Sequence, residues 1–558
     1  MERNGAQILL ETLKEEGVDA IFGYPGANTL PIHDGLIDHT IRHYLMRHEQ
    51  AAAHAADGYA RATGKVGVCL ATSGPGATNL VTGIATAYMD SSPVVALTGQ
   101  VPTDLLGTDA FQETDIIGIT MPITKHSFLV RDPRDMRTTL KQAFSLAKQG
   151  RPGPVLVDLP RNVLAGRCPE AEIRPEEPAM KKTGNGHALD EGILNRIAQA
   201  LNQAERPILI IGGGVKLSGA CQLITELIER GNIPFVSTMM GVGAVCIANG
   251  LNLGFIGTHG FELANRMIHQ SDFILAVGTR FTDRSTSKVE EFAPLATIAQ
   301  IDIDPTSIGK NIKADLALVC DIRKALSGLI GLVDEKERGD WKDRIQKERE
   351  SLEAKNSYNG CGLPGRLIGL VQEALSPTAI AVADVGLNQI WTVRSWKSKS
   401  PRGLLTSGGM GTMGFSLPAS IGAKVGNPKR NVVSFTGDGG FFMNIQELAT
   451  ISYYQVPVKI IVFNNGHLGM IRQIQDLFYG SRLSACQLGE KTDIVAVARG
   501  FGLEAERVGA EKPEGAIERL AASDGPYLLE VMVPPGDYVY PIIPPGKSNM
   551  EMIYGRSD

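Results

Sequence analysis

The sequence predicts an α/β protein built from three doubly wound domains, each with its own parallel sheet. Along the 558 residues, short and almost continuous apolar runs alternate with Ala-rich segments of helical character. Such runs are typical of parallel strands that are covered on both faces. Glycine is frequent, at 63 residues, and many glycines end an apolar run. That position favours tight strand-to-helix turns that bring the backbone close to a ligand. The length also predicts several domains.

Two breaks in composition divide the chain into three blocks. Residues 174–187 are rich in Pro, Gly and charge, and residues 334–362 are highly charged with helical periodicity. We expect both to be connections over the surface. The predicted domains are therefore 1–173, 188–333 and 362–545. The apolar runs that predict their strands are 65–74, 93–99 and 153–160; 206–214, 272–278 and 296–304; and 378–386, 431–439, 458–465 and 525–533.

A weak internal repetition connects the first and third blocks. The segments TSGPGATNLVTGIATA, from Thr72, and TSGGMGTMGFSLPASIGA, from Thr406, each place a Gly-rich turn before a helix of small residues. This pattern indicates two related domains on either side of a third, although similar α/β turns can also arise independently.

The composition excludes several classes of protein. Lys and Arg number 55 against 60 Asp and Glu, so no basic excess favours a nucleic-acid partner. The seven cysteines are scattered and never spaced as C-x-x-C, which disfavours a zinc ribbon or a disulfide framework. No apolar stretch reaches the ~18 residues of a membrane span, and the N-terminus is amphipathic, unlike a signal peptide. We expect a soluble cytoplasmic protein.

Two strand ends in the third block carry oxygen ligands. One strand ends in Gly437-Asp438-Gly439-Gly440 and another ends in Asn465, with room for one helix between them. The carboxyl ends of neighbouring parallel strands meet at one edge of a sheet, where ligands of open α/β sheets bind. A carboxylate and an amide oxygen form part of the shell that Mg²⁺ prefers, and phosphates can complete it. Since D-G and N-N are also ordinary turn dipeptides, the pair alone leaves both interpretations open.

This pattern, GDGG…NN, resembles the diphosphate-binding signature of thiamin diphosphate (ThDP) enzymes. Glu49, which precedes an Ala-rich helix, is similar to the glutamate that the family places against the aminopyrimidine ring. A carboxylate bonded to that ring favours the tautomer that takes up the C2 proton of the cofactor. Without this context, Glu49 is an acidic residue that favours a helix N-terminus. The family takes the glutamate and the diphosphate site from different subunits, which implies a homodimer or a homotetramer.

Within these enzymes, the chain most resembles the catalytic subunits of the acetohydroxyacid (acetolactate) synthase family. The motifs that carry the resemblance include FGYPGA (22–27), GTDAFQE (107–113), RFTDR (280–284), TSGGMGTMGF (406–415) and NNGHLGM (464–470). The resemblance implies a fold of the pyruvate oxidase and decarboxylase type. Its pyrimidine-binding, FAD-binding and diphosphate-binding domains would follow one another along the chain, with ThDP, Mg²⁺ and FAD as cofactors.

The resemblance also assigns roles to individual residues. Catalytic roles fall to Glu49, Gln112, Lys125 and Arg284, and the Mg²⁺ ligands to Asp438, Asn465 and the carbonyl of His467. Ala27, Phe111 and Ile474 would contact substrate. Contacts to ThDP are implied for Gly26, Glu49, Pro75, Asn79, Met413, Gly437, Gly439, Gly440, His467, Gly469 and Met470. Contacts to FAD are implied for Arg151, Gly212, Gly213, Gly214, Thr258, His259, Gly278, Arg280, Asp302 and Asp321.

Two of these sites also have support from their residue types. Gly212-Gly213-Gly214 follows a predicted strand and permits close approach by a dinucleotide, although it does not match G-x-G-x-x-G. The guanidinium of Arg284 can hold a carboxylate with two parallel hydrogen bonds and so orient a second 2-oxoacid. On local sequence alone, Arg284 could equally form a surface ion pair.

The implied activity is decarboxylation of pyruvate and its ligation to a second 2-oxoacid, giving 2-acetolactate or 2-aceto-2-hydroxybutyrate for branched-chain amino-acid synthesis. Ile474 stands where the family usually has tryptophan, which should relax the choice of acceptor, and Asn388 stands where histidine is common. The alternatives are a flavin oxidoreductase resembling pyruvate oxidase, or a simple 2-oxoacid decarboxylase. A separate regulatory subunit, feedback inhibition and a redox role for FAD stay open.

Overall fold

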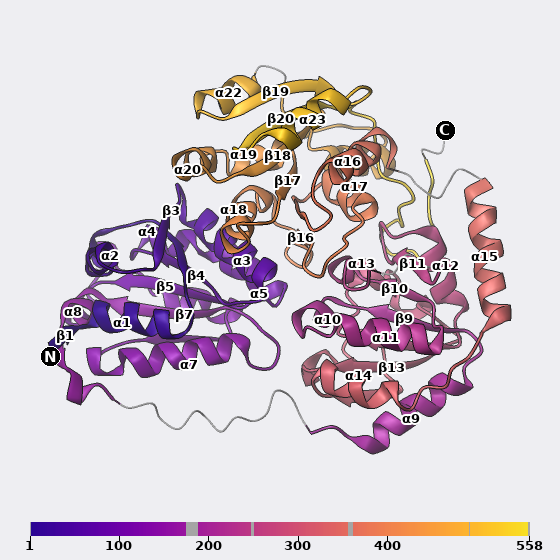
Figure 1. Ribbon diagram of the computed structural model, residues 1–558, viewed down its shortest axis with the longest axis horizontal. Helices are drawn as coiled ribbons and strands as arrows, with labels where there is room; N and C mark the ends of the chain where they lie inside the picture. Colours follow the sequence, from indigo (N-terminus) through magenta and orange to yellow (C-terminus); the bar gives the residue numbers. More distant parts are fainter. Residues whose placement is uncertain (1, 175–187, 247–249, 355–360, 490–491, 556–558) are drawn as a thin grey trace.

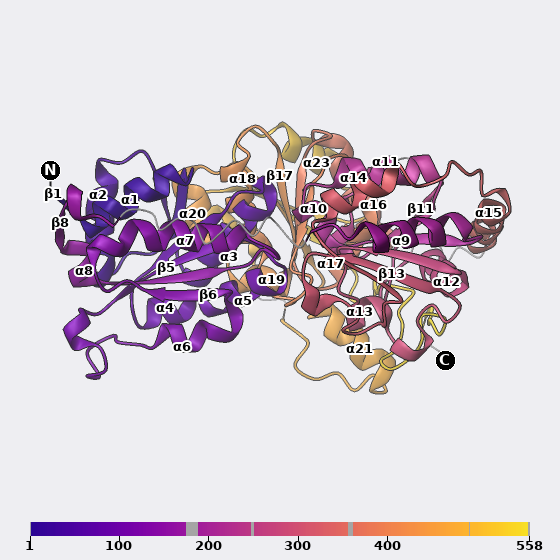
Figure 2. The ribbon, with the colours of Figure 1, turned by 90° about the horizontal axis from the view of Figure 1, so that it is seen from below.

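The computed structural model describes residues 2–174, 188–246, 250–354, 361–489 and 492–555, and these form three domains with separate parallel sheets. In Figure 1 the N-terminal domain lies on the left, the central domain on the lower right, and the C-terminal domain above and between them. Figure 2 shows the same three sheets from below, each with helices on both faces. This arrangement is the α/β architecture that the sequence predicts.

The N-terminal domain holds a six-stranded sheet and a short antiparallel ribbon. Its sheet order is β3 (Arg42–Leu45), β2 (Ala20–Gly23), β4 (Gly67–Ala71), β5 (Val94–Gln100), β7 (Val155–Pro160) and β6 (His126–Leu129). The ribbon pairs β1 (Glu2–Asn4) with β8 (Arg167–Pro169). The helices are α1 (Gly5–Glu15), α2 (Leu30–Ile37), α3 (Glu49–Thr63), α4 (Pro75–Asn79), α5 (Val81–Met89), α6 (Ile116–Thr120), α7 (Met136–Lys148) and α8 (Arg161–Ala165).

The central domain holds a second sheet of six parallel strands. Its order is β11 (Asn252–Phe255), β10 (Phe235–Ser237), β9 (Pro207–Ile211), β12 (Phe273–Val277), β13 (Thr297–Asp302) and β14 (Leu316–Val319). Its helices are α9 (Glu191–Gln203), α10 (Gly213–Leu217), α11 (Cys221–Gly231), α12 (Glu262–Gln270), α13 (Asp283–Thr286), α14 (Ile322–Ile330) and α15 (Gly339–Ala354).

The C-terminal domain holds the third sheet. Its order is β16 (Leu404–Thr406), β15 (Ile380–Ala383), β17 (Val432–Gly437), β18 (Val458–Asn464), β20 (Tyr527–Met532) and β19 (Glu504–Gly509). Its helices are α16 (Gly362–Ala374), α17 (Leu387–Ser395), α18 (Ser416–Gly426), α19 (Asp438–Met443), α20 (Glu447–Tyr454), α21 (Gly469–Phe478), α22 (Ile494–Gly500) and α23 (Glu514–Ala522).

Strand order separates the outer domains from the central one. Counted along the chain within each sheet, the N- and C-terminal sheets share the order second, first, third, fourth, sixth, fifth. The central sheet instead runs third, second, first, fourth, fifth, sixth, which is the order of dinucleotide-binding folds. The two Gly-rich turns at Thr72 and Thr406 therefore belong to domains of one topology, and the domain between them has another.

Helices α3 and α18 join the outer domains by close contact between small residues. A Cβ added to Gly58 would lie 2.1 Å from the carbonyl oxygen of Ala419, and one added to Gly422 would lie 1.8 Å from that of Ala55. Only glycine permits backbones to approach so closely. This contact explains the Ala- and Gly-rich sequence of both helices, and it fixes the direction of α3, whose first residue is Glu49.

Of the two predicted connections, the structure describes most of the second, and it is more than a path over the surface. The first lies outside the described residues except for Arg174. In the second, α15 forms, and its Trp341, Ile345 and Leu352 are buried in the core of the central domain. The periodic charged segment is thus an amphipathic helix, while residues 355–360 lie outside the described part. Among the helices of the described part, none combines the length and the apolar character that a bilayer crossing requires.

Candidate active site

The carboxyl ends of β17 and β18 bring Asp438 and Asn465 to one edge of the C-terminal sheet. The two strands are parallel neighbours, with Gly437 opposite Phe463, so the residues that follow them lie side by side. The Asp438 side chain is buried, with 4% of the residue exposed. Its Oδ1 accepts the N–H of Gly439 at 3.0 Å, and its buried Oδ2 has no hydrogen-bond partner within the described residues. Burial raises the pKa of this carboxyl to about 6.

Asn465 and His467 are fixed by local hydrogen bonds. Asn465 Oδ1 accepts the N–H of His467 at 3.0 Å. His467 Nδ1 lies 2.8 Å from the carbonyl oxygen of Asn465, and Nε2 lies 2.9 Å from a guanidinium nitrogen of Arg472. A Cβ on Gly469 would lie 2.7 Å from Asn465 Nδ2, which explains glycine at the start of α21. Both ring nitrogens of His467 therefore have hydrogen-bond partners. Its backbone carbonyl is the group of this residue that could offer an oxygen atom to a cation.

The described residues contain no group of three or more His, Cys, Asp or Glu side chains that could hold a metal. A cation at this edge would need amide and backbone oxygens beside the Asp438 carboxylate. Mg²⁺ suits such an incomplete oxygen shell when phosphate oxygens supply the missing ligands. A buried carboxylate oxygen without a partner is costly by itself, and a cation would relieve that cost.

Met413 lies beside this edge on a turn held by a buried carboxylate. A Cβ on Gly439 would lie 3.4 Å from Met413 Cε. Asp384, which follows β15 and is fully buried, accepts the N–H of Gly414 at 2.9 Å and that of Ser416 at 2.8 Å. The residues on both sides of Phe415 are thus tied to the sheet, and the turn that carries Met413 is fixed. Asn388 donates to the carbonyl of Asp384 at 2.8 Å, so it belongs to the same support.

Glu49 lies at the corresponding edge of the N-terminal sheet. It begins α3, and its Oε2 accepts a hydrogen bond from Asn79 Nδ2 at 2.9 Å. A Cβ on Gly76 would lie 3.3 Å from Glu49 Oε1, and one on Gly26 would lie 2.4 Å from Thr72 Cβ. Gly26, the Pro75 turn, Asn79 and Glu49 are therefore gathered where β2 and β4 end, although they are far apart in the sequence.

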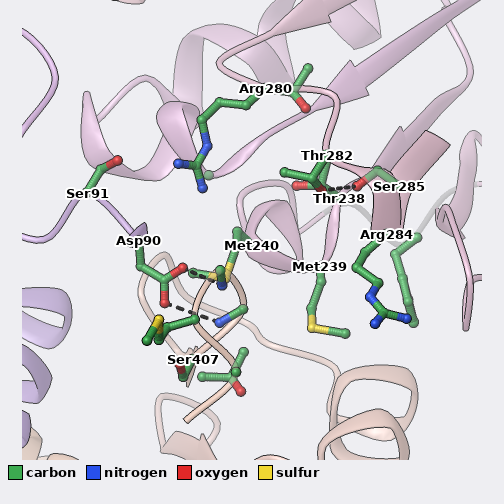
Figure 3. A pocket seen from close by; sticks show the side chains of 18 of the residues that line it. Asp90, Ser91, Thr238, Met239, Met240, Arg280, Thr282, Arg284, Ser285 and Ser407 are labelled. Atoms are coloured by element: carbon green, nitrogen blue, oxygen red, sulfur yellow. Dashed lines mark hydrogen bonds between the residues drawn. The ribbon is translucent and has the colours of Figure 1, made fainter. Parts of the chain in front are cut away.

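A cavity of about 1080 Å³ lies where the three domains meet (Figure 3). All the residues that the family resemblance assigns to FAD line it, except Gly212. Gly212 lies next to the residues that line the cavity, and a Cβ added to Gly212 would come within 1.9 Å of the carbonyl oxygen of Gly278. Gly212 follows β9 and Gly278 follows β12, the two strands at which the order of the central sheet reverses. Ligands of open α/β sheets bind at such a switch point.

Several polar groups of the cavity come from the N-terminal and central domains. Arg280 donates to the carbonyl of Met89 at 2.8 Å, and Arg151 Nε donates to Ser91 Oγ at 2.7 Å. Asp302 ends β13, and burial raises its pKa to about 6. The guanidinium groups of Arg151 and Arg280 and the carboxyl of Asp302, together with the apolar side chains of the lining, suit an organic ligand with both anionic groups and hydroxyl groups.

Arg284 borders the same cavity together with Met470, Ile474 and Phe478 of α21. Its side chain is 75% exposed, and the nearest carboxylate, that of Asp283, is 3.8 Å away and also exposed. Figure 3 shows Arg280 and Arg284 reaching the cavity from different parts of the central domain. An exposed pair of this kind is weak, so the Arg284 guanidinium is available to a carboxylate ligand.

Comparison with known proteins gives a consistent result. Family models of the thiamine pyrophosphate enzymes match residues 3–119 (N-terminal TPP binding domain), 194–329 (central domain) and 384–531 (C-terminal TPP binding domain). A protein of Methanocaldococcus jannaschii named "Probable acetolactate synthase large subunit" is 45% identical, over 97% of this chain and 94% of its own. The "Acetolactate synthase isozyme 2 large subunit" of Escherichia coli K12 is 40% identical, over 99% of both chains. The chain belongs to the acetolactate synthase large-subunit family.

Membership in this family of thiamine pyrophosphate enzymes confirms the resemblance, the fold class and the ThDP-dependent type of enzyme that the sequence predicts. The two sheet edges that carry Glu49 and Asp438 are separate from each other and from the cavity. Glu49, Asp438 and Asn465 do not line the central cavity, and Glu49 belongs to a different domain from Asp438 and Asn465.

Besides Glu49, four residues that the acetolactate synthase resemblance assigns to catalysis or substrate lie away from the cavity. Lys125 Nζ donates to the carbonyls of Leu146 and Gln149, so here it caps the end of α7. Phe111 is 87% exposed. Gln112 has a positive φ of 62°, and its Cα would lie 3.0 Å from a Cβ on Gly74, which places it beside the Pro75 turn. Ala27 begins a 3₁₀ turn immediately after Gly26.

Other lining residues are not singled out by the sequence. Asp90 accepts the N–H groups of Gly408 at 3.2 Å and Gly409 at 2.7 Å, and it pairs with buried Arg61 at 3.0 Å. No local signal marks Asp90, which simply ends α5. The C-terminal segment 542–546 also lines the cavity, and its Pro-Pro-Gly run indicates an irregular loop but no ligand.

Proposed function

We propose that this chain catalyses the acetolactate synthase reaction, in which pyruvate loses CO₂ and the remaining fragment is joined to a second 2-oxoacid. The proposal is supported by relatives named acetolactate synthase over nearly the whole length of the chain. The observation that carries it is the position of Arg284, an exposed guanidinium with only a weak acidic neighbour, at the border of the cavity lined by Met470 and Ile474 of α21. That position suits an anchor for the carboxylate of the acceptor.

ThDP, when bound, supplies an electron sink for decarboxylation and a nucleophilic carbon for bond formation. The chain supplies the groups that hold it. Asp438, Asn465 and the His467 carbonyl would hold Mg²⁺, and the partnerless Oδ2 of Asp438 supports that role. Glu49 would accept a hydrogen bond from the aminopyrimidine ring, with Asn79 fixing its carboxylate by a bond of 2.9 Å. Met413, beside Gly439, would support the cofactor from below.

FAD is proposed for the cavity at the central sheet. The close approach of Gly212 to Gly278 at the switch point supports it, because glycines there let backbone reach a diphosphate. Asp302 would hold ribose hydroxyls, while Arg151 and Arg280 would face anionic groups. The residues that line the cavity would bind and orient FAD, and we propose that its role is structural.

We further propose that the complete ThDP site forms between two copies of the chain. Large apolar side chains are exposed on several elements, among them Phe111, Ile119 and Met121 near α6, Met443 on α19, and Ile471 and Phe478 on α21. Figure 2 shows α4, α6 and α21 along one side of the molecule. A two-fold partner on this side would cover these residues and bring Glu49 of one protomer toward Asp438 of the other. A small regulatory subunit is an additional proposed partner, because relatives are named large subunits.

The deciding experiment supplies holoenzyme with pyruvate, with and without 2-oxobutyrate, and identifies the products by mass spectrometry. We expect 2-acetolactate from pyruvate alone and 2-aceto-2-hydroxybutyrate when 2-oxobutyrate is added. Ile474 has a smaller side chain than the tryptophan that the family usually has at this position. We therefore expect the chain to prefer 2-oxobutyrate over pyruvate as acceptor by no more than about tenfold. Predominant acetaldehyde would indicate a decarboxylase. Acetate formed together with reduction of the flavin would indicate an oxidoreductase.

A further inference from the structure

Helix α20 of the C-terminal domain packs on the segment of the N-terminal domain that leads to Glu49. Glu447 is fully buried, and its Oε1 and Oε2 lie 3.0 and 3.3 Å from the backbone nitrogen of Arg47, whose N–H they accept. Glu49 is only two residues farther along the chain. A carboxylate from another domain thus fixes the backbone immediately before the proposed catalytic carboxylate.

The same face of α20 makes two more bonds to this segment. Tyr454 Oη accepts the N–H of Leu45 at 2.9 Å and donates to the carbonyl of His43 at 3.3 Å. Thr450 Oγ1 donates to Glu447 Oε2 at 2.7 Å and lies 3.4 Å from the carbonyl of Leu45. Residues 447, 450 and 454 are spaced three and four apart, so they share one helix face. We call Glu447, Thr450 and Tyr454 the α20 clamp.

Strand β3 needs an external support of this kind. Among the strands of the described residues, it is at the edge of its sheet with only β2 beside it, and no strand there pairs with the N–H groups on its other side. Leu45 ends β3, and Arg47, His48 and Glu49 follow. Without the α20 clamp, the edge strand and the turn to α3 would be held on one side only, and the position of the Glu49 carboxylate would be less well fixed.

We infer that the α20 clamp is a positioning device for Glu49, in which Glu447 and Tyr454 act through the backbone of residues 45–47 rather than by touching substrate or cofactor. The inference rests on the proposed role of Glu49. The stretch that contains α20 begins with α19 and Asp438, so one short segment connects the proposed metal ligand of a protomer with the support of the Glu49 that this protomer would lend to its partner. Each copy of the chain would therefore set the geometry of both active sites.

The first test measures the backbone in the apoprotein. Tyr454→Phe removes one hydroxyl and keeps the ring, and Tyr453→Phe is the matched control, since Tyr453 is adjacent and 70% exposed. Hydrogen–deuterium exchange of the peptide that spans residues 44–50 should be about tenfold faster in Tyr454→Phe and unchanged in Tyr453→Phe. Equal exchange in both variants would overturn the inference.

The second test measures the consequence for the cofactor in the holoenzyme. Glu447→Ala and Tyr454→Phe should each slow exchange of the C2 proton of bound ThDP by about tenfold or more, because small displacements of a catalytic group are costly. The dissociation constant of ThDP should stay within about twofold, since the residues that bind the diphosphate are not changed. Glu447→Gln, whose amide oxygen can still accept the N–H of Arg47, should recover most of the rate.

Glu49→Gln separates failure of this inference from failure of the proposed function. If Glu49→Gln slows C2-proton exchange while Glu447→Ala and Tyr454→Phe do not, the positioning role is wrong and the role of Glu49 stands. If Glu49→Gln has no effect, the proposed role of Glu49 is wrong, and the inference falls with it. Faster amide exchange together with slower C2-proton exchange in Tyr454→Phe supports the inference.

Discussion

The two proposed cofactor sites of this chain differ in how much of each site a single copy provides. The cavity at the central sheet has walls from all three domains, including Asp90, Arg280 and Gly408. The ThDP site is divided between an N-terminal edge with Glu49 and a C-terminal edge with Asp438, and neither residue lines that cavity. The difference follows from topology. The central cavity is enclosed by all three domains of one copy, whereas Glu49 and Asp438 lie at the edges of two separate sheets, and each edge alone offers only half of the proposed site.

The largest expected effect comes from removing the proposed metal ligand. Asp438→Ala should reduce product formation by more than about 1,000-fold, because the diphosphate of ThDP would lose its cation. FAD content should be unchanged, since the central cavity does not include Asp438. Product assays and flavin absorbance of the same preparation measure both quantities. Loss of flavin together with activity would contradict the independence of the two sites.

Mixing two inactive variants tests the division of the ThDP site between protomers. Glu49→Gln and Asp438→Ala should each be nearly inactive alone. If the variants exchange subunits, half of the dimers are mixed and each mixed dimer has one intact site, so activity should return to roughly a quarter of the wild-type value. The control mixes Glu49→Gln with wild-type protein that has been inactivated by heat. No recovery after proven subunit exchange would place both residues in one chain's site.

An intermediate effect is expected for the acceptor anchor. Arg284→Lys keeps the charge but loses the planar pair of donors, so the KM for pyruvate should rise by about 10- to 100-fold. FAD binding should be little changed, although Arg284 borders the flavin cavity, because its nearest partner is the exposed Asp283. Steady-state kinetics and flavin titration check both statements. A large loss of flavin with an unchanged KM would assign Arg284 to the flavin instead.

The smallest effect concerns the stability of the flavin cavity in the apoprotein. Burial raises the pKa of Asp302 to about 6, above its value in the unfolded chain. The folded state therefore binds more protons between these two values, and this carboxyl destabilises the fold increasingly as pH rises through that window. Asp302→Asn removes the charge. Its gain in unfolding free energy should be on the order of 1 kcal/mol larger at about pH 7.5 than at about pH 5.

Urea unfolding at both pH values measures this gain. FAD affinity of Asp302→Asn should fall by about tenfold, because an amide is a weaker acceptor for ribose hydroxyls than a carboxylate. A gain in stability that is equal at both pH values would show that Asp302 titrates normally. Higher stability and weaker FAD binding in Asp302→Asn would together show that the Asp302 carboxylate destabilises the apoprotein while it strengthens FAD binding.

The strands that the sequence predicts are the long, apolar ones at the centre of each sheet. β5, β9, β12, β17, β18 and β20 all form where an apolar run indicates them. The sequence does not reveal β3, β6, β10, β16 or β19, most of which are short or lie at a sheet edge. A short or half-exposed strand carries little apolar signal, and its pairing depends on partners distant in the sequence.

The site residues also divide into those that a local sequence pattern marks and those that it does not. Asp438 and Asn465 could be paired from the sequence because both follow predicted neighbouring strands, and β17 and β18 are indeed parallel neighbours. Asp90, Asp384 and Glu447 could not be found in this way. Each binds backbone N–H groups of a segment far away in the chain, and no local pattern marks such a contact.

The amino-acid sequence by itself determined the α/β class, the central strands and the residue types available for a metal, a diphosphate and a carboxylate, because these depend on local periodicity and on chemistry carried by single side chains. The tertiary structure alone decided which of these groups meet. It placed Arg280 and Asp302 around one cavity, bound the backbone of Arg47 to α20, and left Asp438 Oδ2 buried without a partner among the described residues. Those relations depend on strand order and domain packing, which bring together residues that no local pattern connects.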